Sequence, residues 1–154
     1  MKFKMLLASI LISYSTLFAE PAQVNMANEN MFNINKAFEK SQAQGKPIFF
    51  IVASANCGHC VDYLNNTVRT NFEVLNRDFV FAISDLTKGD AIPKGLPFDG
   101  TTPTTYILNP NGELMLSPLK GNFSSDYLHE ILNKLYEAYA GNWNDSKEPY
   151  SYKF

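Results

Sequence analysis

The fold is decided by residues 47–60, which read PIFFIVASANCGHC. The first half of this stretch, residues 47–53, is apolar at successive positions, which predicts a central strand covered on both faces. The chain's two cysteines follow at once, as Cys57 and Cys60. A strand followed directly by C-x-x-C places Cys57 where a helix begins, and the unpaired N–H groups and positive dipole end there favour a thiolate. The stretch therefore predicts a reactive dithiol.

Length and charge narrow the possible classes. The chain has 154 residues, of which 45% are hydrophobic and 18% charged. This is enough for one core and short for two, so we expect one domain. Lys and Arg total 13 against 15 Asp and Glu. Nothing basic indicates nucleic acid as a partner.

Residues 1–19 have the layout of a secretory signal peptide. Two lysines precede an apolar stretch over residues 5–18, and the small residue Ala19 stands just before the first acid. This pattern predicts cleavage after Ala19, with a retained membrane anchor as the alternative, although the apolar part is short for a membrane span. Cleavage would remove two lysines and no acids, leaving 11 basic and 15 acidic side chains and a formal charge of −4.

Export bears on the role of the cysteines. Disulfides persist outside the cytosol, so a small exported domain can use them as staples. The loop between Cys57 and Cys60 is too short to remove much entropy from the unfolded chain. A catalytic pair is the better explanation.

Periodicity and turn residues predict the other elements around this centre. Residues 20–32 are polar, Asn-rich and without periodicity, which suggests a flexible leader. The remaining elements are, in order, a helix over 33–45, a helix over 58–69, a short helix over 71–76, a buried strand over 79–83, a long loop over 85–100, a β-hairpin with strands at 104–108 and 113–116, a last helix capped by residues 124–126, and a polar tail over 141–154. Strand, helix and strand at this spacing predict a parallel pair.

Taken in order, these residues resemble the thioredoxin-like superfamily. The resemblance lies in the apolar strand before Cys57-Gly58-His59-Cys60, in Thr102-Pro103-Thr104 before a strand, in Asn111-Gly112-Glu113, and in the C-terminal helix. Lys46-Pro47, the strand that begins at Phe79-Val80, and the signal peptide look like exported bacterial thiol:disulfide interchange proteins. The resemblance implies an α/β fold over residues 33–140, with a central mixed β-sheet of about four strands flanked by helices.

The site follows partly from position and partly from the resemblance. Cys57, exposed at the helix start, should attack, and Cys60, one turn inside, should resolve the mixed disulfide. Gly58 and His59 are the pairing found in disulfide isomerases, and a donor or cation at His59 near the Cys57 sulfur would favour the oxidising or isomerising side. We therefore expect a reduction potential above that of thioredoxin, about −270 mV.

The resemblance also implies a cis bond between Thr102 and Pro103, packed against the dithiol. Proline adopts cis at modest cost, and the backbone of Thr102 would be left to pair with a substrate peptide beside Cys57. An ordinary proline at the start of a strand fits the sequence equally well.

One position departs from the family pattern. Thioredoxins and disulfide isomerases carry a buried acid six residues before the first cysteine, where it exchanges a proton with the resolving thiol. This chain has Ile51 there. Cys60 therefore lacks that base, which puts efficient turnover as a reductase in doubt.

A metal site is the first alternative to the dithiol. Zinc needs four ligands, and the candidates are Cys57, Cys60, His59 and His129. His59 stands between the two cysteines, and His129, on the last helix, is better explained as structural or surface. We expect no metal and no cofactor.

The expected function is therefore periplasmic thiol-disulfide exchange with protein substrates. The expected partners are protein thiols and disulfides and an unidentified redox partner, without nucleic acid and without stable membrane insertion after cleavage. Two rivals stay open. One is a dedicated periplasmic reductase, in cytochrome maturation or sulfur metabolism, and the other is a non-catalytic chaperone or binding module on the same fold.

Overall fold

The computed structural model describes residues 31–139. The predicted signal peptide, residues 20–30 of the predicted leader and the predicted tail lie outside the described residues. Within that range the elements are β1 (Met31–Phe32), α1 (Ile34–Gln44), β2 (Ile48–Ala53), α2 (Gly58–Asp62), the π-helical segment η1 (Tyr63–Val68), α3 (Phe72–Asp78), β3 (Val80–Asp85), the short 3₁₀ helix η2 (Leu86–Lys88), β4 (Thr104–Leu108), β5 (Leu119–Lys120) and α4 (Ser125–Tyr139).

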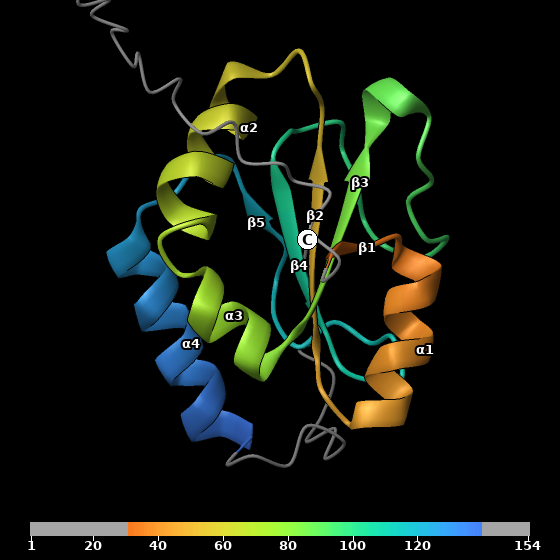
Figure 1. Ribbon diagram of the computed structural model, residues 1–154, viewed down its shortest axis with the longest axis vertical. Coiled ribbons are helices and arrows are strands. Elements are labelled where there is room, and N and C mark those ends of the chain that lie inside the picture. The colour runs from red at the N-terminus through yellow and green to blue at the C-terminus, as the bar shows by residue number, and fades with distance from the viewer. Residues whose placement is uncertain (1–30, 140–154) are drawn as a thin grey trace, which may run out of the picture.

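One mixed sheet forms the centre of the molecule (Figure 1). Its strand order is β1-β3-β2-β4-β5. β1, β3 and β2 run parallel, and β4 and β5 add antiparallel pairs on the other side. The expected α/β fold with a mixed sheet of about four strands is confirmed, and the two edge strands, of two residues each, bring the sheet to five.

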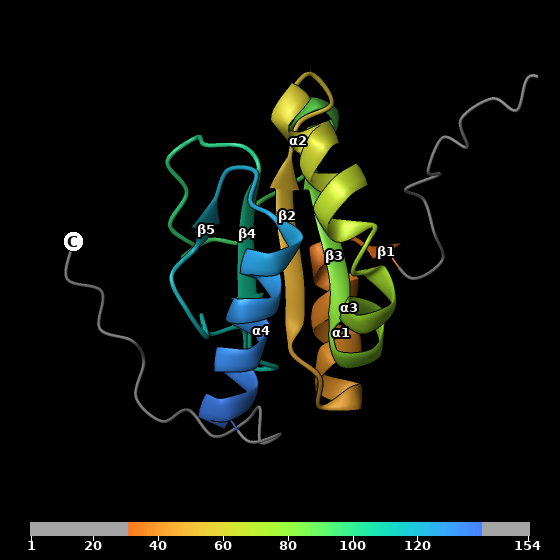
Figure 2. The same ribbon diagram turned by 90° about the vertical axis from the view of Figure 1, so that its left-hand side faces the viewer.

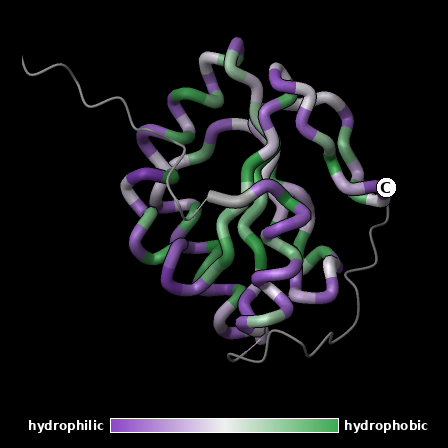
Figure 3. Tube along the Cα trace, turned by 45° about the vertical axis from the view of Figure 1, so that its right-hand side comes forward, coloured by the Kyte–Doolittle hydropathy of each residue, from purple (hydrophilic) through white to green (hydrophobic). Residues whose placement is uncertain are grey.

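β2 is the central strand, and its alternating side chains supply two separate cores. Phe49, Ile51 and Ala53 face one cluster, while Ile48, Phe50 and Val52 face the other. α2, η1, α3 and α4 cover the first face and α1 covers the second (Figures 1 and 2). All six residues of β2 are buried, as the unbroken apolar run predicts. Apolar segments accordingly gather in the middle of the molecule (Figure 3).

Local capping explains where α1 begins and ends. The side chain of Asn33 accepts a hydrogen bond from the backbone N–H of Lys36 at 3.0 Å. At the other end Gly45 adopts the left-handed conformation, with φ 63°, and its N–H bonds the Ser41 carbonyl. The Ser41 hydroxyl donates to the Lys46 carbonyl and joins the helix end to the start of β2. The helix predicted over 33–45 is confirmed.

The segment after β4 differs from the sequence prediction. The turn at Asn109 and Gly112 forms, but the second arm, predicted over 113–116, makes only an isolated bridge between Leu108 and Leu114. Met115 then turns its side chain into the core, and the chain meets the sheet again at β5, beyond Pro118. Pro118 has no N–H to give to a ladder and restricts the residue before it, which favours this interruption. The predicted hairpin is therefore wrong in its second strand.

Three smaller differences concern other elements. β1 takes the last two residues of the segment predicted to be a flexible leader and pairs them with β3. The helix predicted over 58–69 continues from α2 into a π-helical segment. The loop predicted over 85–100 opens with η2, which Asp85 caps through the backbone N–H of Thr87. Across residues 31–139, no helix has the length and apolar character needed to cross a bilayer.

Candidate active site

The dithiol sits where β2 gives way to α2. Cys57 is the residue that caps α2, in extended conformation, and the backbone N–H of Cys60 points at its Sγ at 3.1 Å. A short turn, closed by the Cys57 N–H and the Ser54 carbonyl at 3.1 Å, joins the strand to the helix. Cys57 and Cys60 form a disulfide in this structure. When the bond is reduced, the same N–H group and helix start favour a thiolate at Cys57.

The two sulfurs differ sharply in access. Cys57 is half-buried, and Gly58 and His59 are exposed beside it, whereas Cys60 is only 1% exposed. A Cβ atom added at Gly58 would meet nothing within 4 Å. The space around the first helical turn is therefore open to a bulky reactant, while Cys60 is shielded by the protein.

The loop before β4 lies against the dithiol. The Cys57 Sγ is 3.5 Å from the carbonyl oxygen of Thr102, although the two residues are 45 positions apart in the chain. The Thr102–Pro103 peptide bond is cis. Thr102 is half-buried and Pro103 is buried. Gly121 fixes this loop from behind, because its N–H donates to the Pro103 carbonyl at 2.8 Å. The sequence-predicted residues Cys57, Cys60, Thr102 and Pro103 are thus brought together.

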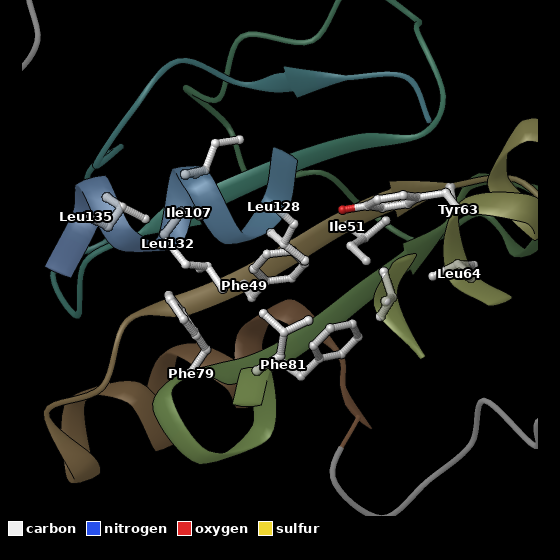
Figure 4. Packing of buried hydrophobic residues seen from close by; sticks show 14 of the residues in the cluster. Phe49, Ile51, Tyr63, Leu64, Phe79, Phe81, Ile107, Leu128, Leu132 and Leu135 are labelled. Atoms are coloured by element: carbon white, nitrogen blue, oxygen red, sulfur yellow. The ribbon is translucent and has the colours of Figure 1, made fainter. Parts of the chain in front are cut away.

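Ile51, which stands where thioredoxins carry a buried acid, lies in a largely apolar layer. Ile51 is fully buried, and its neighbours in the sheet are Ile83 and Thr105. The hydroxyl of Tyr63 forms a hydrogen bond of 3.0 Å with Thr105 in this layer, and Figure 4 shows that hydroxyl pointing toward Ile51. Burial raises the pKa of Tyr63 well above its usual value, and the bond to Thr105 lowers it only in part. The polar pair beside Ile51 is therefore neutral.

A cavity of about 390 Å³ reaches Cys60 on its helix side. It lies between the turn after β2, the helical run from Cys60 to Leu64, and the end of β3 with η2. The Thr87 hydroxyl connects two of these walls, because it accepts the Ala55 N–H at 2.9 Å and bonds the Ser54 hydroxyl at 3.0 Å. The lining residues are Ala53, Ser54, Ala55, Cys60, Val61, Leu64, Ile83, Asp85, Lys88 and Asp90.

Sequence reasoning missed this cavity and the acids on its wall. Asp85 and Asp90 read as polar residues at the end of a strand and in a loop. The signal that existed was indirect: the apolar strand ends in Ala53 and is followed by Ser54 and Ala55, and such small side chains leave space.

Comparison with solved structures supports the fold. A thioredoxin from Thermus thermophilus superposes with a TM-score of 0.53 at 19% identity, covering 79% of this chain and 97% of that one. An oxidoreductase named DsbH superposes with a TM-score of 0.50 at 13% identity, covering 68% of this chain and 83% of its own. No protein-family model and no curated protein matches the sequence.

The chain therefore has the thioredoxin fold. Its paired cysteines lie at the end of the central strand, with a proline loop packed against them.

Proposed function

We propose that this protein is a thiol-disulfide oxidoreductase acting on protein substrates through Cys57 and Cys60. The observation that carries the proposal is the asymmetric pair itself. The sulfur of Cys57 is half-buried at a helix start beside the Thr102 carbonyl, while that of Cys60 is shielded one turn away. A nucleophile needs access and a stabilised thiolate, and a resolving thiol needs neither until the first step is over.

In the reducing direction, the Cys57 thiolate attacks one sulfur of a substrate disulfide. A bond forms between Cys57 and that sulfur, and the other substrate sulfur leaves with the electron pair. The Cys60 thiol then loses its proton and attacks the Cys57 Sγ, which forms the Cys57–Cys60 disulfide and releases the second substrate thiolate. The oxidising direction is the reverse. The backbone of the half-buried Thr102, beside the Cys57 sulfur, is the proposed place for a substrate strand.

We place the preferred direction on the oxidising or isomerising side. The reason is His59, which is exposed in the first turn of α2, two residues after Cys57. A donor or cation there stabilises the reduced protein, and a protein whose reduced form is stabilised is a stronger oxidant. A dedicated reductase is the rival within the same chemistry.

The proposed location is the periplasm, because residues 1–19 read as a cleaved signal peptide. Substrates would then be exported proteins carrying thiols or disulfides, and a further redox protein would recycle the dithiol. Intact-mass analysis of protein recovered from the periplasmic fraction checks this, with Glu20 expected as the first residue. Recovery of the full-length protein from the cytosolic fraction would overturn the proposed location but not the proposed thiol-disulfide chemistry.

The activity is tested by insulin reduction and by oxidative refolding of a reduced substrate. Cys57→Ser should abolish both reactions, because no other sulfur can attack from the open side. Cys60→Ala should instead accumulate mixed disulfides, visible as adducts on non-reducing gels. Glu130→Gln, an exposed change on α4, serves as the control and should leave both activities intact. Activity that survives Cys57→Ser would favour a chaperone or binding module.

A further inference from the structure

Cys60 faces a chemical problem in this protein. Its thiol must lose a proton before it can attack Cys57, yet it packs in an apolar cluster with Ile51, Tyr63 and Leu64. Apolar surroundings disfavour a thiolate. Among residues 31–139 no Asp or Glu side chain is buried. The proton must therefore leave toward a group that is outside the core.

The cavity beside α2 supplies a route. Cys60 forms part of its wall, and the exposed residues Ala55, Lys88 and Asp90 form its rim, so the cavity opens to solvent. Its volume of about 390 Å³ exceeds the roughly 30 Å³ that one water occupies in the liquid. Waters in the cavity can therefore come up against the wall that Cys60 forms, although Cys60 itself is only 1% exposed.

Asp85 is the half-buried acid on this wall. It stands at the end of β3, directly beside Ala53 in the parallel register, and Ala53 is too small to cover it. Its Oδ1 accepts the Thr87 N–H at 3.0 Å, and its Oδ2 lies 3.7 Å from the Lys88 Nζ. Its side chain is 19% exposed, so it touches both the cavity and solvent.

The charges around this cavity keep Asp85 ionised. Partial burial raises the pKa of Asp85. The hydrogen bonds from Thr87, with help from Lys88, lower the pKa by more than burial raises it, so the net shift is downward. Asp90 also lines the cavity and accepts the Asp85 N–H at 2.9 Å through its Oδ2. On the helix side Tyr63 is neutral, and His59 and Asp62 are exposed.

We propose that Asp85 accepts the proton of Cys60, through water in the cavity, when Cys60 attacks the mixed disulfide at Cys57. This step rests on the proposed function. The bond between Cys57 and the substrate sulfur breaks, the Cys57–Cys60 bond forms, and the substrate leaves as a thiolate with the electron pair. The proton passes to the Asp85 carboxylate and from there to solvent. Asp85 thereby supplies from the end of β3 what position 51 does not supply from β2.

The step can be isolated with the reduced protein and dithiobis-nitrobenzoate. Attack by Cys57 releases one coloured thiolate, and attack by Cys60 on the resulting mixed disulfide releases a second. Asp85→Asn keeps an oxygen for the Thr87 N–H and removes the proton acceptor. We expect the second phase to slow by about tenfold or more, with the first phase unchanged. Added formate, a small carboxylate, should restore part of the lost rate.

A purely electrostatic role predicts the opposite result. If the Asp85 charge only disfavoured the Cys60 thiolate, its removal would speed the second phase at neutral pH. A faster or unchanged second phase would therefore overturn the proposal. Lys88→Gln removes the cation on the same wall and should not slow the second phase, and Asp85→Glu should recover most of the rate lost in Asp85→Asn. Denaturation curves confirm that each variant is folded.

Failure of this inference and failure of the proposed function are distinguishable in the same assay. If the wild-type protein gives both phases and Asp85→Asn does not slow the second, the dithiol chemistry stands and the role of Asp85 as proton acceptor is overturned. If the wild-type protein releases no coloured thiolate, both the proposed function and the role of Asp85 are overturned.

Discussion

At the scale of single residues, Tyr63 and Thr105 place a hydroxyl pair inside an otherwise apolar layer. Their hydrogen bond satisfies both groups, and Tyr63 has no exposed surface. A buried polar group without a partner costs about 1–3 kcal/mol of stability, and each hydroxyl removes this cost for the other. The pair is neutral, which suits a layer that also holds Ile51.

This layer predicts a pH dependence of stability. Burial raises the pKa of Tyr63 above its ordinary value of 10.0. The unfolded chain therefore loses the phenol proton at lower pH than the folded chain, and the unfolding free energy falls as pH rises above about 10. Tyr63→Phe should reduce that fall by up to about 1.4 kcal/mol per pH unit. Denaturant titrations of the wild-type protein and Tyr63→Phe between neutral and strongly alkaline pH measure how the unfolding free energy falls.

Other tyrosines set the background for this measurement. Burial raises the pKa of Tyr106 and of Tyr136 to about 12, so part of the alkaline loss should remain in Tyr63→Phe. At neutral pH the same variant leaves the Thr105 hydroxyl without its partner and should cost about 1–3 kcal/mol. A Tyr63→Phe protein with an unchanged alkaline slope would contradict the assignment.

At the scale of elements, the turn after β4 shows how one position fixes a connection. Gly112 has φ 86°, and a Cβ added there would come within 3.1 Å of the ring of Phe38. Asn109 closes the turn, because its Oδ1 accepts the N–H groups of Asn111 and Glu113 at 3.0 and 2.9 Å. The turn therefore packs against α1 as well as ending β4.

Gly112→Ala should destabilise the protein more than Gly45→Ala. Both glycines have positive φ, which costs an alanine about 1 kcal/mol, but a Cβ at Gly45 meets nothing within 4 Å. The difference between the two variants therefore isolates the contact with Phe38. We expect Gly112→Ala to cost at least about 1 kcal/mol more, measured by chemical denaturation. Equal costs would mean that the ring moves aside freely.

The elements also show what could be predicted from sequence. β2 and α4 were predictable because apolar spacing is a local signal, and so was the dithiol at the strand end. The second arm of the hairpin was predicted wrongly, because the spacing of Leu114 and Leu116 does not show that Met115 turns into the core. The two residues of β1 are too few for any periodicity. The cavity could not be predicted, since Ala53 and Asp85 meet only through the register of two strands.

At the scale of the whole molecule, the redox state and the folding equilibrium are linked. If the protein lies on the oxidising side, the reduced form should be the more stable to denaturant, because its Cys57 thiolate gains contacts that the disulfide lacks. A potential 30 mV higher corresponds to about 1.4 kcal/mol. Denaturation of the oxidised and reduced protein measures the difference.

His59→Ala tests the proposed role of His59: if its ring stabilises the reduced protein, the difference in unfolding free energy between the oxidised and reduced forms should narrow. A wild-type protein that is more stable when oxidised would instead point to the dedicated reductase. The result decides between two directions of the same chemistry and leaves the fold untouched.

The short length of the two outer strands, β1 and β5, has a consequence for how a protein substrate could bind. Within residues 31–139, β1 and β5 span two residues each, so each of these two strands presents only a short row of outward-facing amide groups. A long exposed edge strand pairs with extended apolar peptides without selectivity and promotes aggregation. Under the proposed function, two such short strands would add little to peptide binding by strand pairing, and a substrate would be held mainly by the mixed disulfide at the Cys57 sulfur.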